Sequence, residues 1–63
     1  MDIQSQKRKL QKEGYKLSDN QHNGVLFAKI VGNTLFRAFI DHSGNIMRYM
    51  PTKANKYQKR IFS

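Results

Sequence analysis

One apolar stretch dominates this chain and limits the folds that it can adopt. Residues 25–41 read VLFAKIVGNTLFRAFID, two runs rich in β-branched and aromatic residues on either side of Gly32-Asn33. Runs of this composition are typical of β-strands, and a Gly-Asn pair between them is compatible with a tight hairpin turn. We therefore expect two antiparallel strands joined at Gly32-Asn33.

This turn fixes which side chains share a face of the sheet. With Val31 facing Thr34, the residues pair outward and alternate between the two faces. The face that we expect to be covered carries Lys29 together with Val25, Phe27, Phe36, Ala38 and Ile40. The opposite face carries Leu26, Ala28, Ile30, Leu35, Arg37 and Phe39. Because both faces are largely apolar and little chain is left to cover the second, we also expect self-association into a homodimer.

A cationic helix is expected ahead of the hairpin. Residues 3–13 are good helix formers, Asp2 can cap their start, and Gly14 suits the left-handed position that ends a helix. Ile3 and Leu10 share one side of this helix, so its apolar stripe is thin. The opposite side carries Arg8, Lys9 and Lys12.

Shorter signals flank the hairpin. Tyr15 and Leu17 alternate as in a short edge strand, and the polar residues that follow predict a loop. Downstream, DHSGN predicts a second turn. A third strand is expected at residues 46–50, ending at Pro51 because proline cannot extend the ladder of hydrogen bonds.

The tail changes to a helical period. Thr52 can cap a helix in which Ala54, Tyr57 and Ile61 fall on one side. Its cations are Lys53, Lys56, Lys59 and Arg60. We therefore predict an α+β fold for residues 1–63, a single small basic domain with an N-terminal helix, a three-stranded antiparallel β-meander and a short basic C-terminal helix.

The amino-acid composition limits the classes of partner that we expect. Lys and Arg number 12 against 4 Asp and Glu, and the formal net charge of +8 favours polyanionic partners. The chain has no cysteine, which suits a reducing cytoplasm, and no pattern of residues predicts a disulfide, a structural metal or another cofactor. Charges and Gly32-Asn33 interrupt the apolar run, so we predict neither a signal peptide nor a spanning helix, and no membrane partner.

Two cations lie inside the apolar run, and they admit two interpretations. In one, Lys29 and Arg37 pack their stems on the sheet and extend their charges to solvent. In the other, Arg37 belongs to a half-exposed sheet surface that meets phosphates or base edges. The expected register places Arg48 opposite Phe39 and on the same face as Arg37, where the two guanidinium groups would act together.

Two families resemble parts of this pattern. The stretch LFRAFIDHSGNIMRYMPTKANKY resembles the strand, glycine turn, strand and Thr-Lys helix start of the arm-binding domains of tyrosine recombinases and of AP2 domains. That resemblance implies a sheet that enters the major groove. The whole order of elements also resembles a double-stranded-RNA-binding domain, in which the first helix, a loop and the start of the last helix grip the duplex. Lys53, Lys56 and His22 would match those positions.

Catalytic chemistry has weaker support. A nuclease or metal site could be imagined from His22, His42, Asp19 and Asp41. These residues stand in DNQHNG and DHSGN, which are first of all turn compositions. No nucleophilic triad and no glycine-rich phosphate loop is recognisable in the sequence, so we do not expect an enzyme.

The sequence thus leads to one hypothesis and one alternative. The hypothesis is a small non-enzymatic nucleic-acid-binding protein or regulator that contacts DNA or RNA with basic helices and arginines of the sheet. The expected contact residues are Arg8, Lys9, Lys12, Arg37, Arg48, Lys53, Lys56, Lys59 and Arg60. The alternative is an inhibitor or adaptor of the kind that compact viral and mobile-element genomes encode, which binds an acidic surface on a protein of a nucleic-acid-processing machine.

Overall fold

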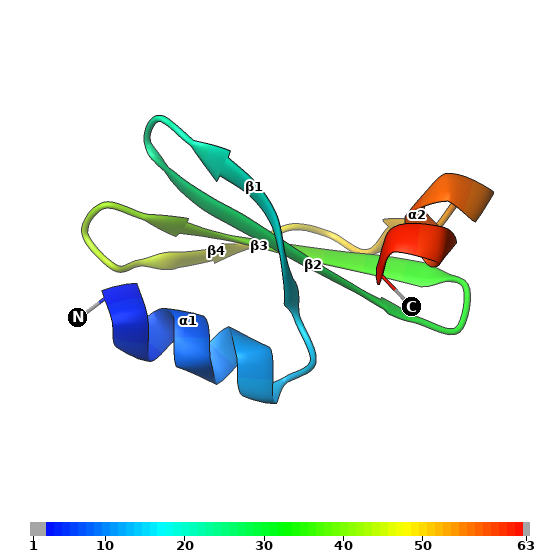
Figure 1. The fold of residues 1–63 in the computed structure, drawn as a ribbon, viewed down its shortest axis with the longest axis horizontal. Coiled ribbons are helices and arrows are strands. Elements are labelled where there is room, and N and C mark those ends of the chain that lie inside the picture. Colours follow the sequence, from blue (N-terminus) through cyan, green and yellow to red (C-terminus); the bar gives the residue numbers. More distant parts are fainter. Residues whose placement is uncertain (1–2, 63) are drawn as a thin grey trace.

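A twisted antiparallel sheet carries the two helices of this chain at opposite ends (Figure 1). A computed structural model describes residues 3–62, and Asp2, the expected helix cap, lies outside the described residues. The elements are α1 (Ile3–Lys12), β1 (Lys16–Gln21), β2 (Gly24–Val31), β3 (Thr34–Asp41), β4 (Ile46–Arg48), β5 (Thr52–Lys53) and α2 (Lys56–Phe62). The strands neighbour one another in the order β1-β2-β3-β4, and β5 pairs with β3. The predicted α+β class is confirmed.

The central hairpin has the predicted register. Val31 pairs with Thr34, Phe27 with Ala38 and Val25 with Ile40. Gly32 takes a φ of 63°, a left-handed conformation that glycine adopts without the steric cost of a Cβ atom.

The main core lies between α1 and the face that we expected to be covered. Leu10 of α1 and Tyr15 pack against Phe27, Ala38 and Ile40, and these side chains are almost fully buried. Val25, Phe36, Ile3 and Ile46 pack around this cluster and are partly buried. Phe27 and Phe36 therefore share one side of the sheet, as the hairpin turn predicted.

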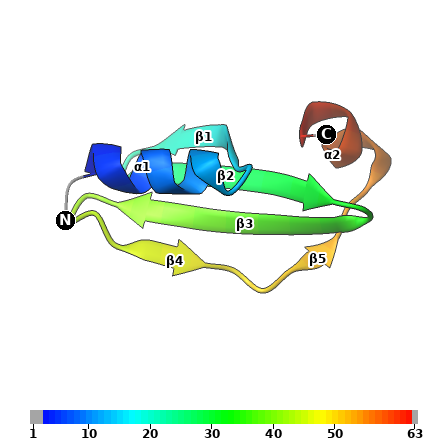
Figure 2. The same ribbon diagram turned by 90° about the horizontal axis from the view of Figure 1, so that it is seen from below.

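The second helix covers part of the other face. Ala54, just before α2, is buried with Ala28 and Leu35, and Ile30 and Phe62 pack against them. Figure 1 shows α1 below one end of the sheet and α2 above the other, and in Figure 2 α1 crosses in front of the sheet. This face is better covered than we expected, because Ala28 and Phe39 are buried without a second molecule.

The first strand is longer than predicted. Asp19, Asn20 and Gln21, which we expected in a loop, pair with β2. The register shifts between Leu17 and Asp19, so an irregularity interrupts the pairing there. The residues of β1, KLSDNQ, are all exposed and nearly all polar. The strand therefore lacks the alternation of apolar and polar residues by which strands are recognised in a sequence.

The predicted register of the third strand is wrong by one residue. Arg48 pairs with Ala38 instead of Phe39. The amide of Asp41 donates to the carbonyl of Asn45, so the loop contains only residues 42–44, and the expected register requires Asn45 in the loop as well. Gly44 has a φ of 85°, and a left-handed residue at the end of a short loop is a common way to close a hairpin. Because side chains alternate, this shift moves Arg48 to the α1 side of the sheet.

The start of the last helix also differs from the prediction. Thr52 belongs to β5, where it pairs with Leu35 of β3, and it does not cap the helix. Instead, the amide of Gln58 donates to Asn55 Oδ1 (2.8 Å), and the amide of Asn55 donates to Gln58 Oε1 (3.0 Å). This reciprocal pair is a capping box, which satisfies amides that a helix start leaves unpaired. Of the expected apolar stripe, Ala54 is buried, but Tyr57 and Ile61 are exposed.

Candidate nucleic-acid interface

The part of the sheet that α2 leaves uncovered is the main candidate surface. We call it the open sheet face and define it as Leu26, Phe39, Met47, Arg37 and Tyr49. Phe39 pairs with Leu26 on one side and with Met47 on the other. Two residues before Phe39 in β3, the carbonyl of Arg37 accepts a hydrogen bond from the amide of Tyr49. Met47 and Tyr49 are 54% and 43% exposed, so this face offers apolar and aromatic surface to a partner.

Phe39 is buried although it lies outside the α2 cluster. A Cβ atom at Gly24 would clash with the Phe39 ring and with the carbonyl of Ile40. The ring therefore lies directly over the backbone of Gly24, which only glycine allows at this distance. Phe39 forms the floor of the open sheet face, while Met47 and Tyr49 stand out from it.

Arg37 is the cation of the open sheet face. Its guanidinium carbon lies 5.4 Å from the centroid of the Tyr49 ring, a cation-π distance. Its Nε atom is buried and has no hydrogen-bond partner. Within residues 3–62 no carboxylate pairs with this guanidinium. A buried donor without a partner is uncommon in folded proteins, and a guanidinium group is well suited to bind a phosphate or a base edge.

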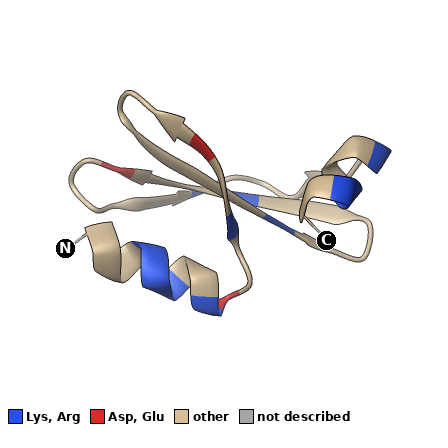
Figure 3. Cartoon of the chain, viewed as in Figure 1, with Lys and Arg blue, Asp and Glu red and all other residues tan. Residues whose placement is uncertain are grey.

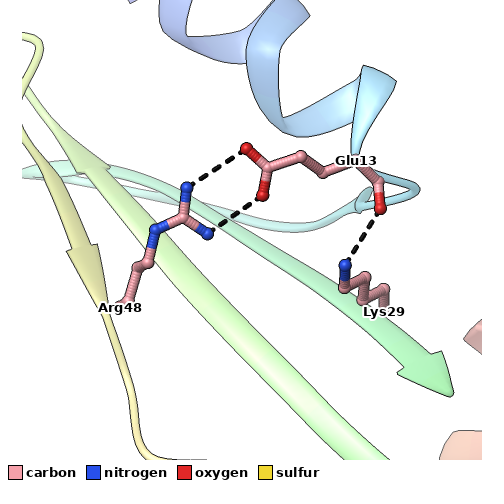
Figure 4. Close-up of polar contacts among 3 residues, drawn as sticks. All are labelled: Glu13, Lys29 and Arg48. Atoms are coloured by element: carbon pink, nitrogen blue, oxygen red, sulfur yellow. Dashed lines mark hydrogen bonds and ion pairs between the residues drawn. The ribbon is translucent and has the colours of Figure 1, made fainter.

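Lys29, the other cation of the apolar run, is held by the protein itself. Its Nζ donates to the carbonyl of Glu13 at 3.0 Å (Figure 4). The same Nζ lies 4.7 Å from the Tyr15 ring centroid. A second ring, that of Phe36, lies 5.6 Å away. Because Lys29 binds a carbonyl at the end of α1, its role agrees with packing of the stem and not with contact to a ligand.

Arg48 is also engaged, and it does not join Arg37. Its two terminal nitrogens donate to the two carboxylate oxygens of Glu13 at 3.1 and 3.2 Å (Figure 4). This guanidinium holds the pKa of Glu13 below its ordinary value, and the carboxylate in turn raises the pKa of Arg48. The expected pair of arginines on one face is therefore wrong, because Arg37 and Arg48 lie on opposite faces.

Most of the remaining predicted contact residues belong to two separate groups. Figure 3 shows one group of cations on α1 and another on α2. The α1 group consists of Arg8, Lys9 and Lys12, all exposed. The α2 group consists of Lys56 and Arg60, both exposed, and Lys59, which is half-buried. Lys53 is exposed in β5. The structure thus brings α2 and the open sheet face to the same side, and it places α1 on the other.

His22, His42 and Asp41 take part in hydrogen bonds that hold the hairpin loops. Asp41 Oδ1 accepts the amides of Ser43 (2.9 Å) and Asn45 (3.0 Å), and these bonds lower the pKa of Asp41, with the Asn45 amide the largest cause. A ring nitrogen of His42 lies 2.9 Å from the carbonyl of His22, which joins the two hairpin loops. Among residues 3–62, no group of three or more His, Asp or Glu could hold a metal ion.

Tyr49 was not among the contact residues expected from the sequence. Its place beside Arg37 follows from the loop of residues 42–44, which sets the register of β4. Leu26 and Met47 were likewise not among the expected contacts. The alternation of side chains along β4 could have placed Met47 and Tyr49 on the same face as Arg37, but only once the length of the preceding loop is known.

Comparison of this chain with protein-family models, curated proteins and solved structures finds no match. The geometry also differs from what one resemblance implies. A duplex gripped by α1 and by the start of α2 needs both helices on one side, and here they lie on opposite faces of the sheet. No helix within the described residues is long and apolar enough to cross a membrane.

Proposed function

We propose that this chain is a small non-enzymatic protein that binds nucleic acid. The observation that carries the proposal is Arg37, which lies on an open sheet face with a buried Nε that has no hydrogen-bond partner. It stacks on Tyr49 beside apolar side chains. A guanidinium next to an aromatic ring suits a phosphate or base edge together with a base face.

The charge of the whole chain supports the same proposal. The formal net charge is +8, and no acidic residue follows Asp41 in the sequence. Within residues 3–62 the only ion pair joins Arg48 to Glu13, so the lysines and arginines of α1 and α2 keep their charges available. Exposed cations of this kind bind phosphates without regard to sequence and release counterions when they do so.

A salt titration tests this proposal. Binding of fluorescein-labelled single-stranded DNA, RNA and duplex DNA would be followed by anisotropy at increasing salt. We expect micromolar affinity at low salt and a linear fall of log K with log salt concentration. Replacing Lys56 and Arg60 by Ala together should weaken binding and reduce the slope, whereas Gln11→Ala, at an exposed position of α1, is a control without a change of charge. Absence of binding to all three probes at low salt would disprove the proposal.

A protein partner is the second candidate, and the methionines favour it. Met50 is 83% exposed and Met47 is 54% exposed. Flexible thioether side chains are common on surfaces that bind other proteins. On this alternative, the chain is an adaptor or inhibitor of viral or mobile-element type that docks on an acidic protein surface in the cytoplasm. Stoichiometric capture of one protein, together with no shift of any nucleic-acid probe, would support it.

A further inference from the structure

We propose that the open sheet face is a stacking site for unpaired bases, so that the chain binds single-stranded nucleic acid in preference to duplex. This inference rests on the proposed function and deepens it, because it names the form of nucleic acid and the residues that select it. Tyr49 would stack a base and Arg37 would hold a phosphate or a base edge.

The chemistry of the open sheet face suits base faces better than base edges. Met47 and the ring of Tyr49 present apolar and aromatic surface, and Leu26 is partly exposed beside them. Arg37 supplies the one charged hydrogen-bonding group among the residues that define this face, and Asp19 lies next to Leu26 at the edge of the sheet. In a duplex, base faces are buried in the stack and only edges with donors and acceptors are open to a protein. Unpaired bases expose their faces, which stack on aromatic rings regardless of sequence.

Further cations lie on the same side of the sheet as the open sheet face and can bind phosphates. Lys16 pairs with Ala28, and Ala28 pairs with Arg37, whose other neighbour is Tyr49. Lys16 and Arg37 therefore lie on the same face, one at the edge of the sheet and one at its centre. α2, whose Phe62 packs against the cluster of Ala28, Leu35 and Ala54, adds the exposed cations Lys56 and Arg60 on this side. A strand seated on the open sheet face would therefore have further cations on the same side of the sheet to bind its phosphates.

Charge complementarity favours a nucleic-acid strand over a second copy of the chain as the partner of the open sheet face. Two copies joined through their open sheet faces would bring together two molecules of net charge +8 and two Arg37 guanidinium groups whose buried Nε atoms have no hydrogen-bond partner. Like charges at such an interface oppose association. A nucleic-acid strand has the opposite charge, supplies acceptors for Arg37 and presents flat apolar rings to Tyr49.

Tyr49→Trp gives a direct probe of stacking, because the chain contains no tryptophan. The variant would be titrated with oligothymidylate of about a dozen nucleotides, a length within the range that single-strand sites occupy. We expect its fluorescence to be quenched by oligothymidylate and much less by a duplex of equal length. Tyr57→Trp is the matched control, since Tyr57 is 70% exposed on α2 and does not belong to the open sheet face. Its fluorescence should change little.

Affinity measurements complete the test. Tyr49→Leu should weaken binding to oligothymidylate about tenfold and leave duplex binding nearly unchanged, because the stacking is removed while the cations that bind phosphates remain. Arg37→Lys keeps the charge but loses the guanidinium fork, and we expect it also to reduce the preference for the single strand. Circular dichroism would verify that each variant is folded.

Three results would overturn the inference while the proposed function stands. They are equal affinity for single strand and duplex, unchanged affinity in both variants, and equal quenching of the two tryptophan variants. A dimer that dissociates in Tyr49→Leu would show that a second copy occupies the face instead. Failure of the wild-type protein to bind any probe would remove the proposed function as well.

Discussion

Two cations inside one apolar run have opposite environments, and the difference lies in what each face of the sheet provides. On the α1 side, Lys29 meets the carbonyl of Glu13 and the ring of Tyr15. On the other side, Arg37 has a tyrosine ring and no acceptor for its Nε. A cation that the fold itself satisfies is best explained by stability, and one that the fold leaves without an acceptor is a better candidate for ligand binding.

Glu13 joins three elements, so its removal should be visible in the stability of the chain. The carboxylate binds Arg48 of β4, and the carbonyl of the same residue binds Lys29 of β2. We predict that Glu13→Gln lowers the melting temperature at neutral pH, because the amide cannot form the ion pair. Arg48→Lys should have a smaller effect, since it keeps the charge but loses the two parallel hydrogen bonds.

The pH dependence of this effect follows from the lowered pKa of Glu13. The folded protein binds the Glu13 proton less readily than the unfolded chain does. The stabilisation is therefore present above the ordinary pKa of glutamate, about 4.3, and is lost as the pH falls through the lowered value. Melting curves of wild type and Glu13→Gln should differ at pH 7 and converge in acid. A constant difference at all pH values would contradict this account.

The two phenylalanines on the α1 side should differ in their contributions to stability. Phe27 is 1% exposed within the main cluster, whereas Phe36 is only partly buried at its margin. We predict that Phe27→Ala costs about 3–5 kcal/mol, enough to unfold much of so small a domain. Phe36→Ala should cost less, because the site is closer to solvent. Urea denaturation of both variants measures the two costs, and a larger cost at Phe36 would refute the order.

At the scale of elements, the sequence predicted best where local chemistry sets geometry. Gly32-Asn33 fixed the central hairpin, and the apolar pattern then identified the face that α1 covers. The register of β4 was missed because DHSGN is compatible with two loop lengths. Which one forms depends on the hydrogen bonds that the amides of Ser43 and Asn45 donate to Asp41 Oδ1.

Elements without an apolar pattern were the hardest to predict. β1 is fully exposed, and only its backbone pairing with β2 makes it a strand. β5 continues along β3 after the chain passes Pro51, so a residue that resembled a helix cap became part of the sheet. For the same reason the candidate site was only half predicted. Arg37 was expected, but its partner on the open sheet face is Tyr49 and not Arg48.

The capping box of α2 offers a test at the same scale. Asn55→Ala removes the acceptor for the amide of Gln58, and we predict a cost of about 1 kcal/mol. Because α2 and Ala54 cover Ala28 and Leu35, the amides of this end of the sheet should exchange hydrogen faster in the variant. Asn55→Asp retains an acceptor at the cap and is the control. Equal exchange rates in all three proteins would show that the cap does not hold α2 in place.

At the scale of the whole molecule, the cations of the two helices lie on opposite faces of the sheet, and this limits which of them one nucleic-acid strand can contact. The described chain measures 33 × 23 × 18 Å, with α1 on one face of the sheet and α2 and the open sheet face on the other. A short strand seated on the open sheet face can reach α2 and Lys16, but it cannot also reach the α1 cations. A longer strand can pass around the edge of the sheet and bind both groups.

We therefore predict that the contribution of α1 depends on the length of the probe. With oligothymidylate of about six nucleotides, replacing Lys56 and Arg60 by Ala should reduce the salt slope by about 0.7 for each phosphate that the variant no longer neutralises. Replacing Lys9 and Lys12 by Ala should leave the salt slope on this short probe almost unchanged, because these residues lie on the opposite face. With a probe several times longer, both double variants should reduce the slope. Equal reductions on the short probe would mean that nucleic acid does not bind on the open sheet face, and a reduction from Lys9 and Lys12 alone would place the binding surface on α1.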